Sequence, residues 1–182
     1  MNQPASVTPL TAHGLASVEV HMAQALAEAV HALAQGEFPV GCVLVSQGQV
    51  VARGRRRHSG GVAVNELDHA EIIALRDLLT NNPDVPPAEV TAYTTLEPCL
   101  MCYAALMISG VRNIVYAYED VLGGGVCLPR GRMPPLYRNL RLTIVHKVMR
   151  EESLRLFREF FSRPEGVYLK DSLLARHVLA QP

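Results

Sequence analysis

Three potential metal ligands and one acidic residue stand at a spacing that suits zinc chemistry. His69 to Glu71 reads His-Ala-Glu, and thirty positions after the histidine Pro98 to Cys102 reads Pro-Cys-Leu-Met-Cys. One imidazole and two thiolates form a three-ligand set, and a catalytic zinc ion keeps three protein ligands so that water can take the fourth position. The spacing therefore predicts one zinc ion per chain, bound by His69, Cys99 and Cys102.

This chemistry depends on the elements that hold the residues. His69 lies in the first turn of a helix predicted over 68–79, with Asp68 as its N-cap. The two cysteines lie at positions i and i+3 in a helix predicted over 98–109, so their side chains share a face. A helix N-terminus favours the thiolate form of cysteine. Glu71 points away from the ligand direction but stays close enough to take a proton from zinc-bound water.

A second hypothesis is a zinc-stabilised binding domain without catalytic turnover. A structural zinc ion is bound by four protein ligands, and the candidates for the fourth in this chain are His58, Cys127 and His146. The remaining cysteine, Cys42, lies in an apolar run and is predicted to be a core residue. Glu71 argues against the structural reading, because such a site needs no group that carries protons.

Hydrophobic periodicity predicts the remaining elements. Apolar residues recur at helical spacing over 18–33, with Ser17 as the predicted N-cap and Gly36 as the stop. Gln47 and Gly48 mark a hairpin turn between two short strands. The other predicted elements are strands at 40–45, 50–52, 90–95, 113–118 and 140–145, a loop at 54–67, and helices at 151–161 and within 167–180.

Their order predicts an α/β fold with three layers, α/β/α, around a mixed five-stranded sheet. The hairpin strands should be antiparallel, and strands joined by helices should be parallel. The 182 residues divide into a lead-in (1–16), a catalytic domain (17–163) and a C-terminal extension (164–182). No apolar run approaches the ~18 residues of a membrane span and no signal peptide is evident, which predicts a cytoplasmic protein without a membrane partner.

The charge of the chain is balanced, with 17 basic and 17 acidic residues. This balance argues against a strongly basic nucleic-acid coat protein and against an acidic tail protein. A local basic run nevertheless occurs at Arg53, Arg55, Arg56, Arg57 and His58. Such a run is suited to the phosphates of a nucleotide or of RNA, and it is equally typical of a solvated loop.

Taken together, the two motifs resemble those of the zinc-dependent nucleobase deaminases, whose signature is H-x-E followed by P-C-x-x-C. Residues 39–45 (PVGCVLV) and 94–97 (TTLE) add to the resemblance, which covers residues 18–163. The family is the cytidine deaminase-like superfamily, and the chain is most similar to its bacterial tRNA-specific adenosine deaminase branch. The resemblance implies the fold of that superfamily, a homodimer, and hydrolytic deamination of a nucleobase in tRNA or in a free base, nucleoside or nucleotide such as guanine, cytosine or CMP.

The resemblance also implies roles for single residues. The three zinc ligands match those of the family, and Glu71 matches its proton shuttle, which deprotonates the water, protonates the ring nitrogen and helps ammonia to leave. The N–H of Ala70 and the C=O of Pro98 occupy the places where the family holds the base and the attacked amino group. Val40 occupies a position that packs against the base.

One position departs from the family's pattern. The family has an asparagine a few residues past a glycine, after the second strand, where it binds the base or the ribose. In this chain Gly54 is followed by arginines, and Arg56 occupies the expected place. Either the nearest asparagine, Asn65, takes the role through a rearranged loop, or Arg56 contacts a different substrate. The sequence leaves a small-molecule substrate and tRNA both open.

Overall fold

The computed structural model describes residues 12–60, 64–164 and 168–182 and contains one five-stranded sheet. The strand order is β2-β1-β3-β4-β5, in which β1 runs antiparallel to both of its neighbours and the β3–β4 and β4–β5 pairs are parallel. The main elements are α1 (Ala12–Ala34), β1 (Gly41–Ser46), β2 (Gln49–Arg55), α2 (Ala70–Asn81), β3 (Thr91–Leu96), α3 (Leu100–Ile108), β4 (Asn113–Tyr118), α4 (Pro135–Arg138), β5 (Thr143–His146), α5 (Arg150–Phe161) and α6 (Leu173–Leu179). The predicted mixed sheet is confirmed.

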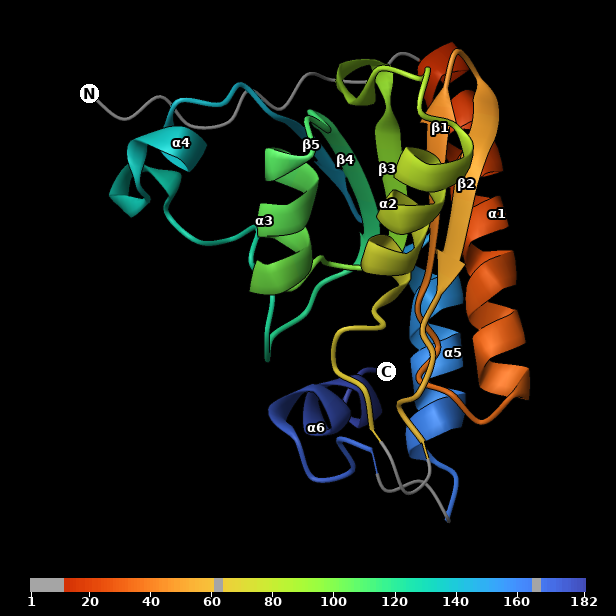
Figure 1. Cartoon of the computed structure of the whole chain (residues 1–182). Helices are drawn as coiled ribbons and strands as arrows, with labels where there is room; N and C mark the ends of the chain where they lie inside the picture. The colour runs from red at the N-terminus through yellow and green to blue at the C-terminus, as the bar shows by residue number, and fades with distance from the viewer. Residues whose placement is uncertain (1–11, 61–63, 165–167) are drawn as a thin grey trace.

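Helices cover both faces of the sheet (Figure 1), as the three-layer prediction requires. Helices α1 and α5 lie together on one face, and α2 and α3 lie side by side on the other. Strand β1 is buried along its whole length because both of its faces are covered. Alternate side chains serve the two faces: Val43 packs in the cluster with α1, and Leu44 packs in the cluster with α2 and α3.

The predicted hairpin is confirmed, and its turn lies at Gln47 and Gly48 as expected. Gln47 and Gly48 adopt positive φ angles of 50° and 75°, as a two-residue turn between antiparallel strands requires. Strand β2 continues to Arg55, into the predicted loop, because Gly41 pairs with Arg55 across the ladder. Gly36, with φ of 77°, follows the end of α1 as predicted.

Two predicted helix starts are wrong. Helix α1 begins at Ala12 rather than after Ser17. The N-cap of α2 is His69 rather than Asp68. The Asp68 carboxylate is engaged elsewhere, since its Oδ2 lies 2.7 Å from Nδ1 of His58 and accepts a hydrogen bond from Nδ2 of Asn65 at 2.9 Å. Partners within the preceding loop thus hold the carboxylate that would otherwise cap the helix.

None of the helices in the described residues is both long enough and apolar enough to cross a membrane. In the predicted extension, α6 begins after Ser172, whose Oγ accepts a hydrogen bond from the backbone N–H of Ala175 at 3.1 Å. This helix lies near one end of the sheet, away from the turn of the β1–β2 hairpin (Figure 1). Its first turn supplies Leu174 to the lining of a pocket beside His69.

Candidate active site

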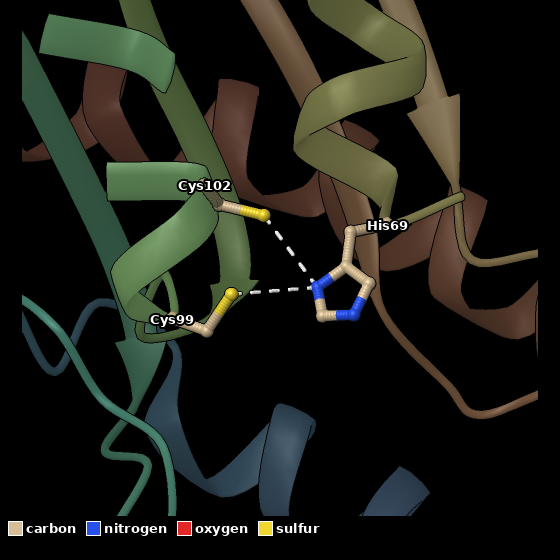
Figure 2. A group of neighbouring side chains, drawn as sticks. All are labelled: His69, Cys99 and Cys102. Carbon is tan, nitrogen blue, oxygen red and sulfur yellow. Dashed lines mark hydrogen bonds between the residues drawn. The ribbon is translucent and has the colours of Figure 1, made fainter. Parts of the chain in front are cut away.

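The three predicted ligands come together where the N-termini of α2 and α3 meet (Figure 2). Nδ1 of His69 lies 3.6 Å from Sγ of Cys99 and 3.5 Å from Sγ of Cys102. With Zn–S near 2.3 Å and Zn–N near 2.0–2.1 Å, tetrahedral zinc places such a nitrogen and sulfur about 3.6 Å apart. The donor set and its spacing therefore fit a zinc ion, and this cluster is the chain's zinc site.

The candidates for a fourth protein ligand lie outside this cluster. In the described part of the chain, no histidine, cysteine or carboxylate joins the three residues, whose ligand atoms all lie within 4.8 Å of one another. His58 pairs with Asp68, the Sγ of Cys127 donates to the carbonyl of Gly124 at 3.6 Å, and His146 packs beside a tyrosine on the neighbouring strand β4. Three protein ligands are the arrangement of a catalytic rather than a structural zinc site.

The two thiols differ in acidity. A hydrogen bond from Cys102 lowers the pKa of Cys99 to about 4, so that Cys99 is a thiolate at neutral pH. The pKa of Cys102 is raised, because its thiol donates that hydrogen bond and because it is buried. Metal binding must therefore displace the Cys102 proton, which makes the zinc affinity depend on pH.

Glu71 is a buried carboxyl group in the wall of the pocket that contains the zinc ligands. Its side chain is 3% exposed, and its Oε1 accepts a hydrogen bond from Oγ1 of Thr94 at 3.0 Å. Burial, and then the nearby charge of Cys99, raise the pKa of Glu71. A carboxyl group that releases its proton less readily than an exposed one is suited to carry protons near neutral pH.

A cavity of about 280 Å³ opens beside His69, Cys99 and Glu71. Three of the predicted substrate-contact residues line it, namely Val40, Arg56 and Ala70. The fourth, Pro98, is buried and is not part of the lining, and its carbonyl oxygen accepts a hydrogen bond from the N–H of Gly125 at 2.9 Å. The remaining lining residues are Phe38, Glu66, Leu96, Glu97, Asp120, Leu122, Gly123, Tyr168, Leu169 and Leu174.

Arg56 is a buried residue of the pocket wall, only 1% exposed. Its Nη1 donates to the carbonyl of Asn65 at 2.8 Å, and its Nη2 donates to Oε2 of Glu66 at 2.9 Å and to the hydroxyl of Tyr168 at 3.3 Å. The side chain of Asn65 serves a local turn by accepting the N–H of Leu67. Arg56, rather than Asn65, is therefore the residue that reaches the pocket.

The basic run does not form one phosphate-binding surface. Alternation along the end of β2 turns Arg53 and Arg55 away from Arg56 and toward α1. Both pair there with Glu28, at 3.7 Å and 3.0 Å. Arg57 is exposed. The run thus divides between a pocket residue, an ion-pair cluster on the opposite face of the sheet, one solvated side chain and a histidine that pairs with Asp68.

Several pocket residues were not predicted from the sequence, namely Glu97, Tyr168 and Leu174. Oε1 of Glu97 accepts the N–H groups of Val126 and Cys127, each at 3.1 Å, and its Oε2 accepts the N–H of Asp120 at 3.3 Å. These bonds fix the loop that follows β4. The signal available was the position of Glu97 directly before Pro98. Tyr168 and Leu174, in the C-terminal extension, carry no motif that could have found them.

Comparisons with known proteins agree with this geometry. Residues 16–118 match the family described as the cytidine and deoxycytidylate deaminase zinc-binding region. A tRNA(Ile)-lysidine synthase of Thermus thermophilus is 39% identical over 145 residues, which are 80% of this chain and 25% of that protein. A tRNA-specific adenosine deaminase of Streptococcus pyogenes is 31% identical over 106 residues, 58% of this chain and 60% of that one. The chain thus spans a quarter to three fifths of these relatives.

Solved structures share the fold as well. One, from a study of A-to-I editing by tRNA:A34 deaminases at the wobble position, is 31% identical with a TM-score of 0.65, and the alignment covers 75% of this chain and 98% of that one. A variant of the protein NE0047 in complex with 8-azaguanine is 25% identical with a TM-score of 0.64, covering 79% and 83%.

Proposed function

Because the chain belongs to the cytidine and deoxycytidylate deaminase zinc-binding family, we propose that it is a zinc-dependent hydrolase that deaminates a nucleobase. In this reaction water replaces an amino group on a ring carbon, a C–N bond breaks, a C–O bond forms, and ammonia leaves. The observation that carries the proposal is that the buried Glu71 carboxyl group lines the same cavity as His69 and Cys99, two of the three residues of the zinc cluster.

The chain's own residues divide the work. His69, Cys99 and Cys102 would hold the zinc ion, which, when bound, acts as a Lewis acid and makes water more acidic. Glu71 accepts a proton from the attacking water and delivers it to the ring nitrogen, and it then carries the remaining proton of the added hydroxyl group to the amine, which leaves as ammonia. Thr94 orients the Glu71 carboxyl group through its hydrogen bond. Val40 and other apolar lining residues pack against the base and exclude bulk water.

An ammonia-release assay tests the proposal. Zinc-loaded protein is incubated with a panel of bases, nucleosides, nucleotides and tRNA anticodon stem-loops. A Glu71→Gln variant should retain zinc and lose at least about 10²-fold in rate, since general acid–base groups contribute roughly 10²–10⁴-fold. Glu89→Gln, on the exposed turn η1 (Pro87–Glu89), is the matched control and should leave the rate unchanged. Ammonia release that is equal in the Glu71 variant would remove this residue from the mechanism.

The homodimer implied by the resemblance is supported by an apolar face on α3. Leu100 and Ile108 are 54% and 63% exposed, and Met101 and Ala104 between them are partly exposed. An exposed apolar stripe on a short helix is typical of a subunit interface. Light scattering should give twice the chain mass for the unaltered protein and the chain mass for an Ile108→Glu variant.

A further inference from the structure

One wall of the pocket comes from the C-terminal segment 168–174, outside the region that matches the family. Leu174, in the first turn of α6, is 1% exposed. The ring of Tyr168 lies 5.5 Å from the ring of Phe38 and 5.5 Å from Cζ of Arg56. The family's zinc motif therefore opens into a pocket that is completed by residues outside the family match.

The C-terminal segment that forms this wall packs against the rest of the domain and is hydrogen-bonded to it. Leu174 and Val178 are buried against the main core cluster. Nη2 of Arg150 donates to Oε1 of Gln181 at 3.2 Å, and Nη2 of Arg158 donates to backbone carbonyl oxygens at the end of the chain. The segment is thus part of the folded domain, and a substrate must fit inside the space that it leaves.

Carboxyl groups outnumber basic groups in the lining of the pocket, which is otherwise mostly apolar. Its four carboxyl groups belong to Glu66, Glu71, Glu97 and Asp120, while Arg56 supplies the one guanidinium among the described lining residues. Because Nη2 of Arg56 is bonded to Glu66 at 2.9 Å, that positive charge is already compensated. The zinc site adds little net charge, since two thiolates balance the ion. A phosphate placed at this pocket would face the carboxyl groups of Glu97 and Asp120 and would find no unpaired guanidinium among the described lining residues.

The size of the cavity also favours a small substrate over RNA. A volume of about 280 Å³ lies just below the roughly 300–1,000 Å³ found for small-molecule sites. An RNA substrate would also need basic side chains along its flanking nucleotides. Arg53 and Arg55 are instead paired with Glu28 on the opposite face of the sheet.

We propose that the acidic lining and the wall formed by residues 168–174 select an uncharged free base or nucleoside and reject nucleotides and RNA. This inference rests on the proposed deaminase function and names its substrate class. Glu66, Asp120, Tyr168 and Leu174 are then the residues that determine specificity.

Matched pairs of substrates test the inference. The kcat/KM values of adenosine and AMP, cytidine and CMP, and guanosine and GMP are compared with those of the free bases and of a tRNA anticodon stem-loop. We expect the preferred base or nucleoside to exceed its monophosphate at least tenfold. A preference for a monophosphate or for the stem-loop would overturn the substrate class and leave the deaminase function standing.

Equilibrium binding separates failure of this inference from failure of the function. Isothermal titration calorimetry on the zinc-loaded Glu71→Gln variant measures nucleoside and monophosphate affinities without turnover. The nucleoside should bind at least tenfold more tightly than its monophosphate, even if no ammonia is released by the unaltered protein. Equal affinities, or tighter binding of the monophosphate, would contradict the inference.

An Asp120→Asn variant tests the electrostatic cause. Asparagine keeps an oxygen that can accept the N–H groups of Leu122 and Gly123, as Oδ1 of Asp120 does at 2.9 Å and 3.1 Å. Removing one charge from the lining should reduce the discrimination against monophosphates by roughly threefold to fiftyfold, the range that Coulomb's law gives for an assumed separation of about 7 Å at effective dielectric constants between about 80 and 20. The exposed control Glu89→Gln should leave it unchanged. Discrimination that is identical in Asp120→Asn and the unaltered protein would remove the acidic lining as its cause.

Discussion

Replacement of Gly54 by alanine should displace the helix that carries His69 and so weaken the zinc site. Gly54 lies in β2, directly under the first turns of α2. A Cβ atom at this position would stand 2.0 Å from the carbonyl oxygen of Ala70 and 2.6 Å from the backbone nitrogen of Ala74. Both clashing atoms belong to the helix backbone, so no side-chain rotation can relieve them.

The size of the effect follows from the overlap. Non-bonded heavy atoms pack at about 3.5–4.0 Å, so α2 must move away from β2 by more than about 1 Å. Overpacking of a core costs typically about 1–3 kcal/mol, and a backbone clash should lie near the upper end. The displaced turn carries His69 and Glu71. A misplacement of about 1 Å at a catalytic centre costs about 10²-fold in rate.

Three measurements on Gly54→Ala test this reasoning: urea unfolding, zinc affinity by chelator competition, and the rate of ammonia release. The matched control is Gly60→Ala, whose added Cβ would meet nothing closer than the carbonyl oxygen of Gly36 at 3.4 Å. We expect Gly54→Ala to lose stability, zinc affinity and activity, and Gly60→Ala to keep all three. A Gly54→Ala protein within about 0.5 kcal/mol of the unaltered stability, and with normal zinc affinity, would refute the argument.

Three further predictions concern single side chains. Cys99→Ala should lower the zinc content measured by atomic absorption well below one ion per chain, and undiminished zinc would exclude Cys99 as a ligand. Glu66→Gln should weaken zinc binding severalfold in chelator competition, because Oε2 of Glu66 lies 3.7 Å from Nε2 of His69 and helps to orient that ligand; unchanged affinity would limit Glu66 to the pocket wall. Hydrogen bonds from Arg150 lower the pKa of Glu119 to about 2, so the stability that this pair contributes is present above about pH 4.5 and is lost as the pH falls toward 2. Between about pH 4.5 and 2, the free energy of unfolding measured in urea should fall by about 1–2 kcal/mol less for Glu119→Gln than for the unaltered protein. Parallel plots of this free energy against pH would contradict the pairing.

Much of the fold was predictable because its signals are local. The Gln47-Gly48 turn, the buried strand β4 and the Pro-Cys entry to α3 are each written in a few consecutive residues. The zinc cluster was predictable for a related reason, since each ligand stands at or near a helix start that the sequence indicates. Asp68 shows where local reasoning fails: it has the chemistry of an N-cap, but its partners come from other parts of the loop.

The substrate side of the pocket could not be predicted in this way. Arg56 belongs to a basic run that is typical of a solvated loop. The structure extends β2 into this run, so that alternate residues face opposite layers and Arg56 is buried. Tyr168 and Leu174 reach the pocket through contacts more than one hundred residues away in the sequence. Long-range packing of this kind leaves no periodic or motif signal.

In the proposed mechanism, the three-ligand cluster and Glu71 form one hydrolytic site. The most direct test reconstitutes metal-free protein with one equivalent of zinc and measures ammonia release across bases, nucleosides, nucleotides and tRNA. We predict release that depends on zinc and falls at least about 10²-fold in a Glu71→Gln variant that still binds one zinc ion. A protein that binds one zinc ion per chain but releases no ammonia from any member of the panel would contradict the claim.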